Sequence, residues 1–548
     1  MKRFSSILIL LLIPIISFSQ SAPNQPNTKP KLVVGIVVDQ MRYDYLTRYW
    51  ERYGDGGFRR LVNEGFNCKN NHFNYIPTST APGHASVYTA TTPAVHGIMG
   101  NDWFDKDLNE EVYCVRDLSY EPVGTKDKAG RMAPTRLISS TITDELKVAT
   151  HGKGKVIGVA MKDRGAILPA GHAANAAYWF HGKDEGQFVS SSYYIKKLPD
   201  WVKEFNKSGI AKSYKKDWNT LYPIETYTAS LADDLPYEEK FDGEDAPVFP
   251  HKLPKIWKKN DEYDMIKSSP YGNDLTADFA LAAIEGEQLG ADDITDFLAI
   301  SFSSTDYVGH RFGVDAIETE DTYLRLDKQI ERILTYLDTN IGKGNYTVFL
   351  TADHAAVHAP GYLRDLNLPA GYRSSKPMAT RLKDFLSKKY GTDKLIRNYS
   401  NYQLYFNNEE LAKIGVSSKE LQGVVAEELI GYEGVQEVYT ATQLWKNDYV
   451  QGFGYIVQNG FSKKRSGDVF IVQSPMFIGT SYEKGGTSHG TPYIYDTHVP
   501  LLFFGKGINQ GYTTERTEIP DVSATIAALL GIGFPSGTTG TPVSQVID

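Results

Sequence analysis

Three aspartates and three histidines in this sequence carry side chains that bind zinc-like metal ions. They are Asp39, Asp306, His310, Asp353, His354 and His489. The aspartates stand just after the apolar, β-prone runs LVVGIVV, DFLAISF and YTVFLTA. An open α/β sheet binds ligands in the crevice outside the carboxyl ends of its strands, so we expect these side chains to meet at one sheet edge. The pattern is typical of a hydrolase with two metal ions.

Each of these signals is weak when it is taken alone. Asp306 and His310 are four residues apart, so a helical turn would point both the same way, but a capping Asp and a surface His give the same pattern. Asp353 and His354 stand where the chain leaves a buried strand. His489 lies in the glycine-rich loop KGGTSHGT, which can approach a site or simply expose a histidine. Their shared placement after strands favours the metal-site interpretation.

The segment TSTAPGH offers a nucleophile. Pro82 suits the first turn of a helix, so Thr80 should lie at a helix amino terminus. There the helix dipole and the free amides favour negative charge. A threonine that only caps the helix is the alternative.

Positive charge for an anionic substrate must be local. The net charge of −8 and the pI near 5.9 argue against a general nucleic-acid-binding surface. Lys162 and Arg164 alternate after the strand-like run KVIGVAM and can point the same way as two cationic donors. Exposed loop charges are the alternative for this pair.

Apolar runs alternate with helical patterns over most of the chain, which predicts an α/β fold with a mainly parallel sheet and helices on both faces. The helical patterns occupy residues 56–64, 82–91, 138–149, 274–288 and 318–341, and the final PDVSATIAALLGI follows the strand-like VPLLFFG. Residues 165–272 break this rhythm and predict an insertion that caps the active-site edge. A second irregular region, about 360–480, should form a smaller lobe with one or two helices and short strands.

The amino terminus has the pattern of a secretory signal peptide. A basic start precedes the apolar residues 7–18, and small residues end at Ser19 before Gln20. The apolar stretch is shorter than the ~20 residues of a membrane span, so we expect cleavage near Ser19/Gln20, a flexible leader over 20–30, and export to the periplasm or the medium without membrane attachment. Cys68 and Cys114 can form one disulfide or remain two buried thiols.

Seven short segments occur in order over nearly the whole mature chain: VVDQMR, TSTAPGH, HGIMGNDWF, MKDRGA, SSTDYVGH, TADHA and GTSHGT. In this combination the sequence resembles the alkaline phosphatase superfamily, most closely the phosphate-irrepressible, PafA-type bacterial alkaline phosphatases. The resemblance implies a three-layer α/β/α catalytic domain over residues 31–548, with a mainly parallel central sheet and inserted cap regions.

The resemblance also implies a divided site with two zinc ions. One ion would be held by Asp306, His310 and His489, and the other by Asp39, Asp353 and His354 with the nucleophile Thr80 beside it. Lys162, Arg164 and Asn101 would contact the non-bridging phosphate oxygens. Each zinc keeps an open position, as a catalytic zinc should. Three carboxylates and two divalent ions leave roughly one positive charge to face a phosphate with about two negative charges.

The resemblance implies a hydrolase of small phosphate monoesters that works through a phosphothreonine. We expect a monomer, although the sequence leaves the oligomeric state open. A monoester offers an extra anionic oxygen to Lys162 and Arg164, and the resemblance implies that superfamily phosphodiesterases lack this pair. A phosphodiesterase or nucleotide pyrophosphatase is the first alternative. A secreted metal-containing binding protein is the second. Neither cysteine has the C/SxPxR setting of a sulfatase.

Overall fold

A ten-stranded sheet forms the centre of the computed structural model, which describes residues 29–183 and 186–547. Its order is β18-β2-β17-β10-β1-β9-β6-β7-β8-β5. The strands are β1 (Leu32–Val38), β2 (Phe66–His72), β5 (Pro122–Val123), β6 (Val156–Ala160), β7 (Ala176–His181), β8 (Gln187–Ser191), β9 (Asp296–Phe302), β10 (Tyr346–Thr351), β17 (Leu501–Gly505) and β18 (Gly511–Glu518). Strands β10, β1, β9, β6 and β7 are parallel neighbours, and antiparallel β17 and β8 flank them. This arrangement confirms the predicted α/β fold with a mainly parallel centre.

The three strands that precede the predicted metal ligands lie side by side as β10-β1-β9. Every residue of these strands is buried. Such continuous burial is typical of parallel strands that are covered on both faces, and it explains why their sequences do not alternate between apolar and polar residues. Because the three strands run in one direction, their carboxyl ends reach the same edge of the sheet.

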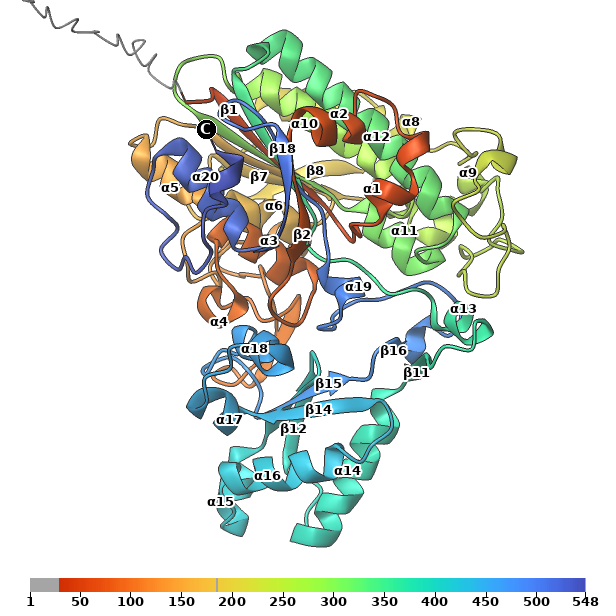
Figure 1. Ribbon diagram of the computed structural model, residues 1–548, viewed down its shortest axis with the longest axis vertical. Helices are drawn as coiled ribbons and strands as arrows, with labels where there is room; N and C mark the ends of the chain where they lie inside the picture. The colour runs from red at the N-terminus through yellow and green to blue at the C-terminus, as the bar shows by residue number, and fades with distance from the viewer. Residues whose placement is uncertain (1–28, 184–185, 548) are drawn as a thin grey trace, which may run out of the picture.

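Helices cover both faces of the sheet (Figure 1). One layer contains α3 (Thr80–Thr89), α5 (Ile142–Ala149), α6 (Asp163–Ala170) and α20 (Asp521–Leu530). The other contains α2 (Phe58–Glu64), α10 (Tyr271–Glu287), α11 (Ser304–Phe312) and α12 (Ile317–Leu337). Helix α5 starts later than predicted because Thr141 caps it with a capping box. The three-layer α/β/α architecture is therefore confirmed.

The cap insertion begins later than the predicted residue 165. Most of α6 and the strands β7 and β8, which join the main sheet, lie within 165–191. These elements were not predicted, because Pro169 interrupts the helical pattern of α6 and the aromatic run AAYWFH of β7 does not have the aliphatic pattern of the other strands. After β8, short helical turns dominate up to α10: α7 (Asp200–Lys207), α8 (Ile210–Ser213), α9 (Leu253–Ile256) and the 3₁₀ helices η3 (Ile224–Thr226), η4 (Trp257–Asn260) and η5 (Glu262–Ser268).

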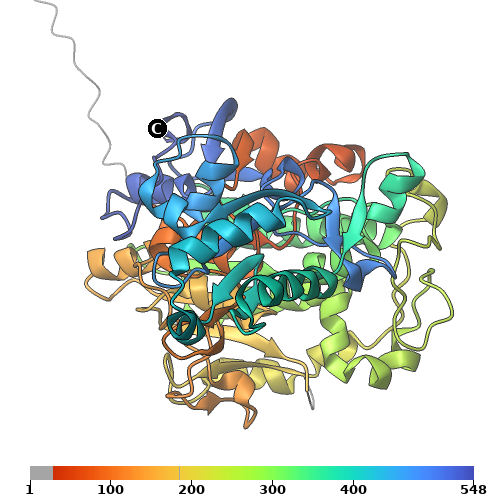
Figure 2. The ribbon, with the colours of Figure 1, turned by 90° about the horizontal axis from the view of Figure 1, so that it is seen from below.

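The smaller lobe has its own four-stranded sheet, of order β12-β13-β15-β14. Its strands are β12 (Ile396–Ser400), β13 (Gln403–Phe406), β14 (Val435–Thr440) and β15 (Val469–Gln473), and its helices are α13 (Pro360–Asp365), α14 (Ser375–Tyr390), α15 (Asn408–Ile414), α16 (Ser418–Leu429), α17 (Ala441–Lys446) and α18 (Gly452–Asn459). The prediction of one or two helices was wrong, because side-chain caps and packing on the lobe's own apolar cluster hold helices too short to show clear periodicity. The lobe lies below the main body in Figure 1 and in front of it in Figure 2, which shows the molecule from below.

The predicted signal peptide and most of the leader lie outside the described residues. Within the described ranges, no helix is long and apolar enough to cross a membrane. Cys68 and Cys114 are both buried and are not joined by a disulfide. Of the two alternatives left open by the sequence, the structure has two buried thiols.

A buried histidine ties the cap insertion to α12, and we expect it to make stability depend on pH. His251 is fully buried and lies 3.0 Å from both Glu244 and Glu318. Burial alone would lower the pKa of His251, but the hydrogen bonds to these two carboxylates raise it from 6.5 to about 9. A raised pKa means that the stabilisation is complete below pH 6.5 and is lost as the pH rises through about 9.

The measurement is the melting temperature of wild type and His251→Gln between about pH 6 and about pH 9.5. Wild type should lose stability over this range, with roughly 3 kcal/mol linked to His251, and the variant should be less stable at the lower pH with a shallower slope. Part of the slope should remain, because burial and Glu318 raise the pKa of Glu238 to about 9, which destabilises in the same direction. Parallel curves for the two proteins would contradict the assignment.

Candidate active site

Asp39, Asp353 and His354 form one set of ligand atoms at the ends of β1 and β10. His354 Nε2 lies 3.4 Å from Asp39 Oδ1 and 3.7 Å from Asp353 Oδ2. All three residues are fully buried, and within the described residues these three atoms have no hydrogen-bond partner. Buried polar atoms that face one another without partners fit a bound cation, because leaving them unpaired is costly.

Asp306, His310 and His489 form a second set beside the first. Asp306 Oδ1 lies 3.1 Å from His310 Nε2, one helical turn along α11, and 3.8 Å from His489 Nε2. The rings of His489 and His354 stack with centroids 3.5 Å apart, and ligand atoms of Asp306, His354 and His489 all lie within 4.8 Å of one another. The two sets are therefore adjacent, and His354 lies at their boundary.

All three imidazoles are oriented by the main chain. The Nδ1 atoms of His310, His489 and His354 lie 2.8, 2.6 and 3.1 Å from the carbonyl oxygens of Thr487, Thr78 and Ala355. A carbonyl oxygen can only accept, so each Nδ1 carries a proton and Nε2 is the nitrogen left to face a metal. Burial alone would lower the pKa of His310, but Asp306 raises it, so a metal there would have to displace a proton from Nε2. Burial lowers the pKa of His354 and of His489, which keeps both imidazoles neutral. Carboxylate oxygens and neutral imidazole nitrogens are the ligands that zinc prefers when no thiolate is present.

Thr80 is buried and is the first residue of α3, as predicted. Its Oγ1 lies 3.5 Å from Lys162 Nζ. His84, one turn along the helix, donates from Nδ1 to the Thr80 carbonyl at 2.8 Å and lies 3.3 Å from Asp353 Oδ2. The hydroxyl therefore lies beside Lys162, and His84 connects the first turn of α3 to Asp353 of the first ligand set.

Lys162 reaches the carboxylates of both sets. Its Nζ lies 2.6 Å from Asp39 Oδ2 and 2.6 Å from Asp306 Oδ2, so it contacts the oxygens that face away from the imidazoles. Burial would lower the pKa of Lys162, but these two carboxylates raise it, and the side chain stays charged. Arg164 donates to the Tyr113 hydroxyl at 3.0 Å, and it lines with Lys162 a pocket of about 290 Å³. Both predicted cations thus face one pocket.

Asn101 connects the helix of Thr80 to Cys114, the residue after Tyr113 of this pocket. Its Oδ1 accepts a hydrogen bond from the Ala81 amide at 2.8 Å, and its carbonyl accepts from the Cys114 amide at 2.9 Å. Because the side-chain oxygen is used, the Nδ2 group remains as a donor.

Gln40 also connects the two ligand sets, and the sequence reasoning missed it. Its Nε2 donates to Asp306 Oδ1 at 2.7 Å, and its main-chain amide donates to Asp353 Oδ1 at 3.1 Å. Its φ of 64° is unusual for a residue other than glycine. A Cβ on Gly309 would lie 1.9 Å from Gln40 Oε1, so the glycine between Asp306 and His310 leaves the space that this amide fills. The available signal was its position directly after Asp39.

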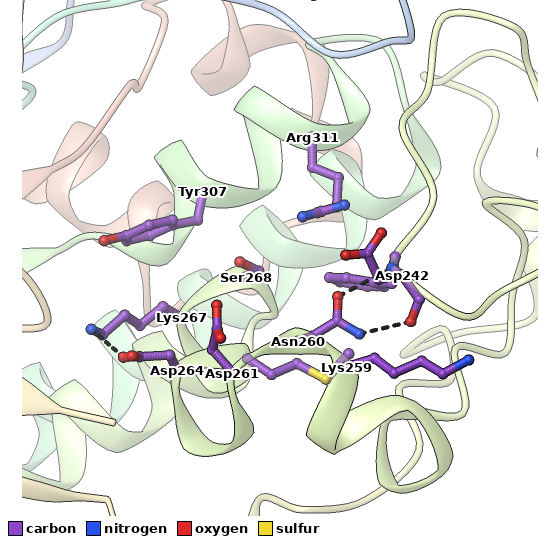
Figure 3. Close-up of a pocket in the computed structure, with 11 residues that line it drawn as sticks. Asp242, Lys259, Asn260, Asp261, Asp264, Lys267, Ser268, Tyr307 and Arg311 are labelled. Carbon is purple, nitrogen blue, oxygen red and sulfur yellow. Dashed lines mark hydrogen bonds and ion pairs between the residues drawn. The ribbon is translucent and has the colours of Figure 1, made fainter. Parts of the chain in front are cut away.

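A second pocket, of about 360 Å³, adjoins the cationic one and shares Asp264, Lys267 and Tyr307 with it. In Figure 3, Tyr307 and Arg311 project from α11 over the pocket, with Tyr307 on the side of the Lys267–Asp264 ion pair of η5 and Arg311 on the side of Asp242 and Asn260. Its wall is mixed in charge, with Lys259, Lys267 and Arg311 against Asp242, Asp261 and Asp264. The space beside the pocket of Lys162 and Arg164 is therefore polar and carries charges of both signs.

Known proteins are similar to this chain over most of its length, including all the strands and helices that carry the site. A family model described as type I phosphodiesterase/nucleotide pyrophosphatase matches residues 33–498. The chain is 46% identical over the full length of both proteins to a Myroides odoratus protein named calcium-transporting ATPase. It is 43% identical to alkaline phosphatase PafA of Elizabethkingia meningoseptica, with 95% of each protein covered. A crystal structure of wild-type alkaline phosphatase PafA matches with a TM-score of 0.91 at 43% identity, covering 95% of this chain and 99% of that one.

Proposed function

The chain belongs to the type I phosphodiesterase/nucleotide pyrophosphatase family of the alkaline phosphatase superfamily, and from that premise we propose an exported two-zinc enzyme that hydrolyses phosphate monoesters. Its identity with an alkaline phosphatase over 95% of the chain supports phosphomonoesterase activity. The observation that carries the proposal is the position of Lys162. Its ammonium group lies 2.6 Å from one carboxylate of each ligand set and 3.5 Å from the Thr80 hydroxyl, in the pocket that Arg164 also lines.

In the proposed reaction, Thr80 Oγ1 loses its proton and attacks the phosphorus atom, the bond from phosphorus to the ester oxygen breaks, and the alcohol leaves after taking up a proton. Water then attacks the resulting phosphothreonine, which releases inorganic phosphate and restores Thr80. The cationic Lys162 and the amino terminus of α3 favour the anionic form of this oxygen. Arg164 and Asn101 bind the non-bridging oxygens and hold the phosphoryl group in line with Thr80. Charge-assisted hydrogen bonds of this kind strengthen as negative charge moves onto those oxygens.

One zinc would be held by Asp39, Asp353 and His354 next to Thr80. The other would be held by Asp306, His310 and His489. When bound, two such ions supply positive charge to the attacking and leaving oxygens and acidify a water molecule for the second step. Lys162 keeps one carboxylate from each set oriented, because it contacts the oxygens that the imidazoles do not face.

The family description favours one alternative, a phosphodiesterase or nucleotide pyrophosphatase. A diester has two non-bridging oxygens that share one negative charge, whereas a monoester has three that carry about two. Two cations in one pocket, Lys162 and Arg164, therefore match the charge of a monoester better. Export rests on the signal-peptide pattern that ends near Ser19/Gln20.

Metal removal provides the direct test. Dialysis against a chelator should abolish hydrolysis of an aryl phosphate, and added zinc should restore it. Magnesium alone should not, because imidazole nitrogens suit zinc whereas magnesium prefers oxygen ligands. The readouts are kcat/KM and the metal content by elemental analysis, with two zinc ions expected per active chain.

Two outcomes would count against the proposal. Full activity in protein that contains no metal would remove the two-zinc site. Zinc binding without phosphatase activity before or after dialysis would favour the alternative of a metal-containing binding protein.

A further inference from the structure

The hairpin of β12 and β13 in the small lobe ends in a turn with an unusual residue. Asn401 and Tyr402 both have left-handed backbone conformations, with φ of 50° and 59°. Two-residue hairpin turns of this type require positive φ at both positions and prefer asparagine followed by glycine. Asparagine adopts the left-handed conformation readily, but tyrosine is strained in it and glycine is not. The tyrosine therefore calls for a reason outside the turn.

Asn401 reaches across to the main body and contacts the residues on either side of Asn101. Its Nδ2 donates to the Asp102 carbonyl at 2.6 Å, a contact between residues 299 positions apart. A Cβ on Gly100 would lie 2.5 Å from the same nitrogen, so the amide occupies space that only a glycine leaves open. The turn thus fixes the main chain immediately before and after Asn101.

Tyr402 lies beside the other half of the active site. The edge of its ring lies 3.6 Å from the position that a Cβ on Gly490 would occupy, next to the predicted metal ligand His489. Its carbonyl accepts a hydrogen bond from the Ile471 amide at 2.9 Å, which anchors the turn to β15. One turn therefore contacts the segment that presents Asn101 and lies beside the loop that presents His489.

The small lobe has other attachments to the main body. Arg465 donates to the carbonyl oxygens of Gly97 and Arg136 at 2.5 and 2.7 Å, and the rings of Tyr405 and Phe104 meet edge to face with centroids 5.3 Å apart. These contacts keep the lobe docked when a single amide of the turn is removed. The contribution of Asn401 can therefore be measured in a folded protein.

We propose that Asn401 and Tyr402 are positioning residues of the active site, and that the small lobe acts through them to set how tightly Asn101 holds the non-bridging oxygens of a phosphate monoester. The inference rests on the proposed function. Neither residue touches the substrate in this scheme. Asn401 acts through the main chain of Asn101, and Tyr402 acts through the loop of His489.

The central experiment compares wild type with Asn401→Gly, which keeps the left-handed turn and deletes only the amide. We expect kcat/KM for an aryl phosphate to fall about 10-fold, the loss that corresponds to one misplaced hydrogen bond. Inhibition by inorganic phosphate should weaken to a similar extent. Turnover of the matching methyl diester should change by less than about 3-fold, because a diester uses fewer of these donors. The melting temperature should not fall.

Asn398→Ala is the matched control. Asn398 lies on the same hairpin and contacts Glu111 at 3.4 Å, away from Asn101, so this variant should keep the wild-type monoester to diester ratio. A double variant with Asn101→Ala should be no worse than Asn101→Ala alone, because coupled residues are not additive. Tyr402→Gly relieves the backbone strain but also removes a ring that packs on the lobe's apolar cluster, so its monoester kcat/KM should fall below that of wild type under conditions in which the variant is shown to be folded.

The outcomes separate the two proposals. Equal losses on both esters, or additive losses with Asn101→Ala, would overturn the role of Asn401. Unchanged kinetics in Tyr402→Gly would overturn the role of Tyr402. A wild-type protein without monoesterase activity would instead contradict the proposed function, so wild type is assayed first.

Discussion

Replacing Thr80 with alanine should lower kcat/KM for an aryl phosphate by about 10⁴-fold or more, which corresponds to about 5.4 kcal/mol of transition-state stabilisation. The covalent route needs an oxygen at this position, at the start of α3 and 3.5 Å from Lys162. Without it, water would have to attack directly in a pocket shaped for a side-chain oxygen. The measurements are steady-state kinetics and acid-quench labelling with a radioactive phosphate ester. Wild type should trap label on Thr80, and the variant should trap none.

Three further variants make this result specific. Thr80→Val keeps the side-chain volume and should be as inactive as Thr80→Ala, so a packing defect is separated from loss of the nucleophile. Thr80→Ser keeps the hydroxyl and should stay within about 10-fold of wild type. Ser79→Ala removes the neighbouring hydroxyl, which makes no capping hydrogen bond, and should remain active. Near-wild-type turnover by Thr80→Ala would end the phosphothreonine mechanism.

Alanine at Lys162 or Arg164 should convert a strong preference for monoesters into a weak one. We expect each substitution to reduce monoester kcat/KM by about 10² to 10³-fold, the usual effect of removing one donor that stabilises transition-state charge. The loss for the methyl diester should be below about 10-fold, because esterification removes the oxygen that these cations would bind. Wild type itself should favour the aryl phosphate over its methyl diester. The reverse preference in wild type would support the phosphodiesterase alternative.

The control for this pair is Lys183→Ala. Lys183 lines the same pocket, but it is largely exposed and pairs with Asp127 at 3.3 Å, so both activities should be retained. Zinc content must be measured in Lys162→Ala, because this lysine also contacts Asp39 and Asp306. Monoester loss with full zinc content supports the phosphate-binding role. Equal losses on the two esters would contradict that role for Lys162 and Arg164.

The residues at the carboxyl ends of the strands could be predicted from the sequence, because the patterns that mark them involve only neighbouring residues. A buried parallel strand must be apolar along its whole length, and the chain must turn out of the sheet after it, so Asp39 and the Asp353–His354 pair could be found from their flanking residues. The helix that starts at Thr80 follows in the same way from Pro82. The same reasoning failed after residue 165, since a proline within α6 and an aromatic-rich strand do not match the usual patterns.

Contacts between distant segments could not be predicted from the sequence. Gln40 meets Asp306 across 266 positions, and Asn401 meets Asp102 across 299. Apart from the position of Gln40 directly after Asp39, no local pattern marks these residues, because the folded surface determines which partner each one meets. The bond between Lys162 and two carboxylates is of the same kind. Its sequence position suggested a phosphate contact but not a role in orienting the ligands.

The site at the ends of β10, β1 and β9 can form only late in folding, because its residues come from distant parts of the chain. Gln40, at the end of β1, and Asp353 lie 313 positions apart, and His489 is oriented by a residue 411 positions away. Contacts of such long range form late and slowly in folding. Neither ligand set is complete before these strands pair, so a metal ion that needs the full set would bind after folding. If the proposed export carries the chain unfolded, the proposed zinc sites would be filled from the metal supply outside the membrane.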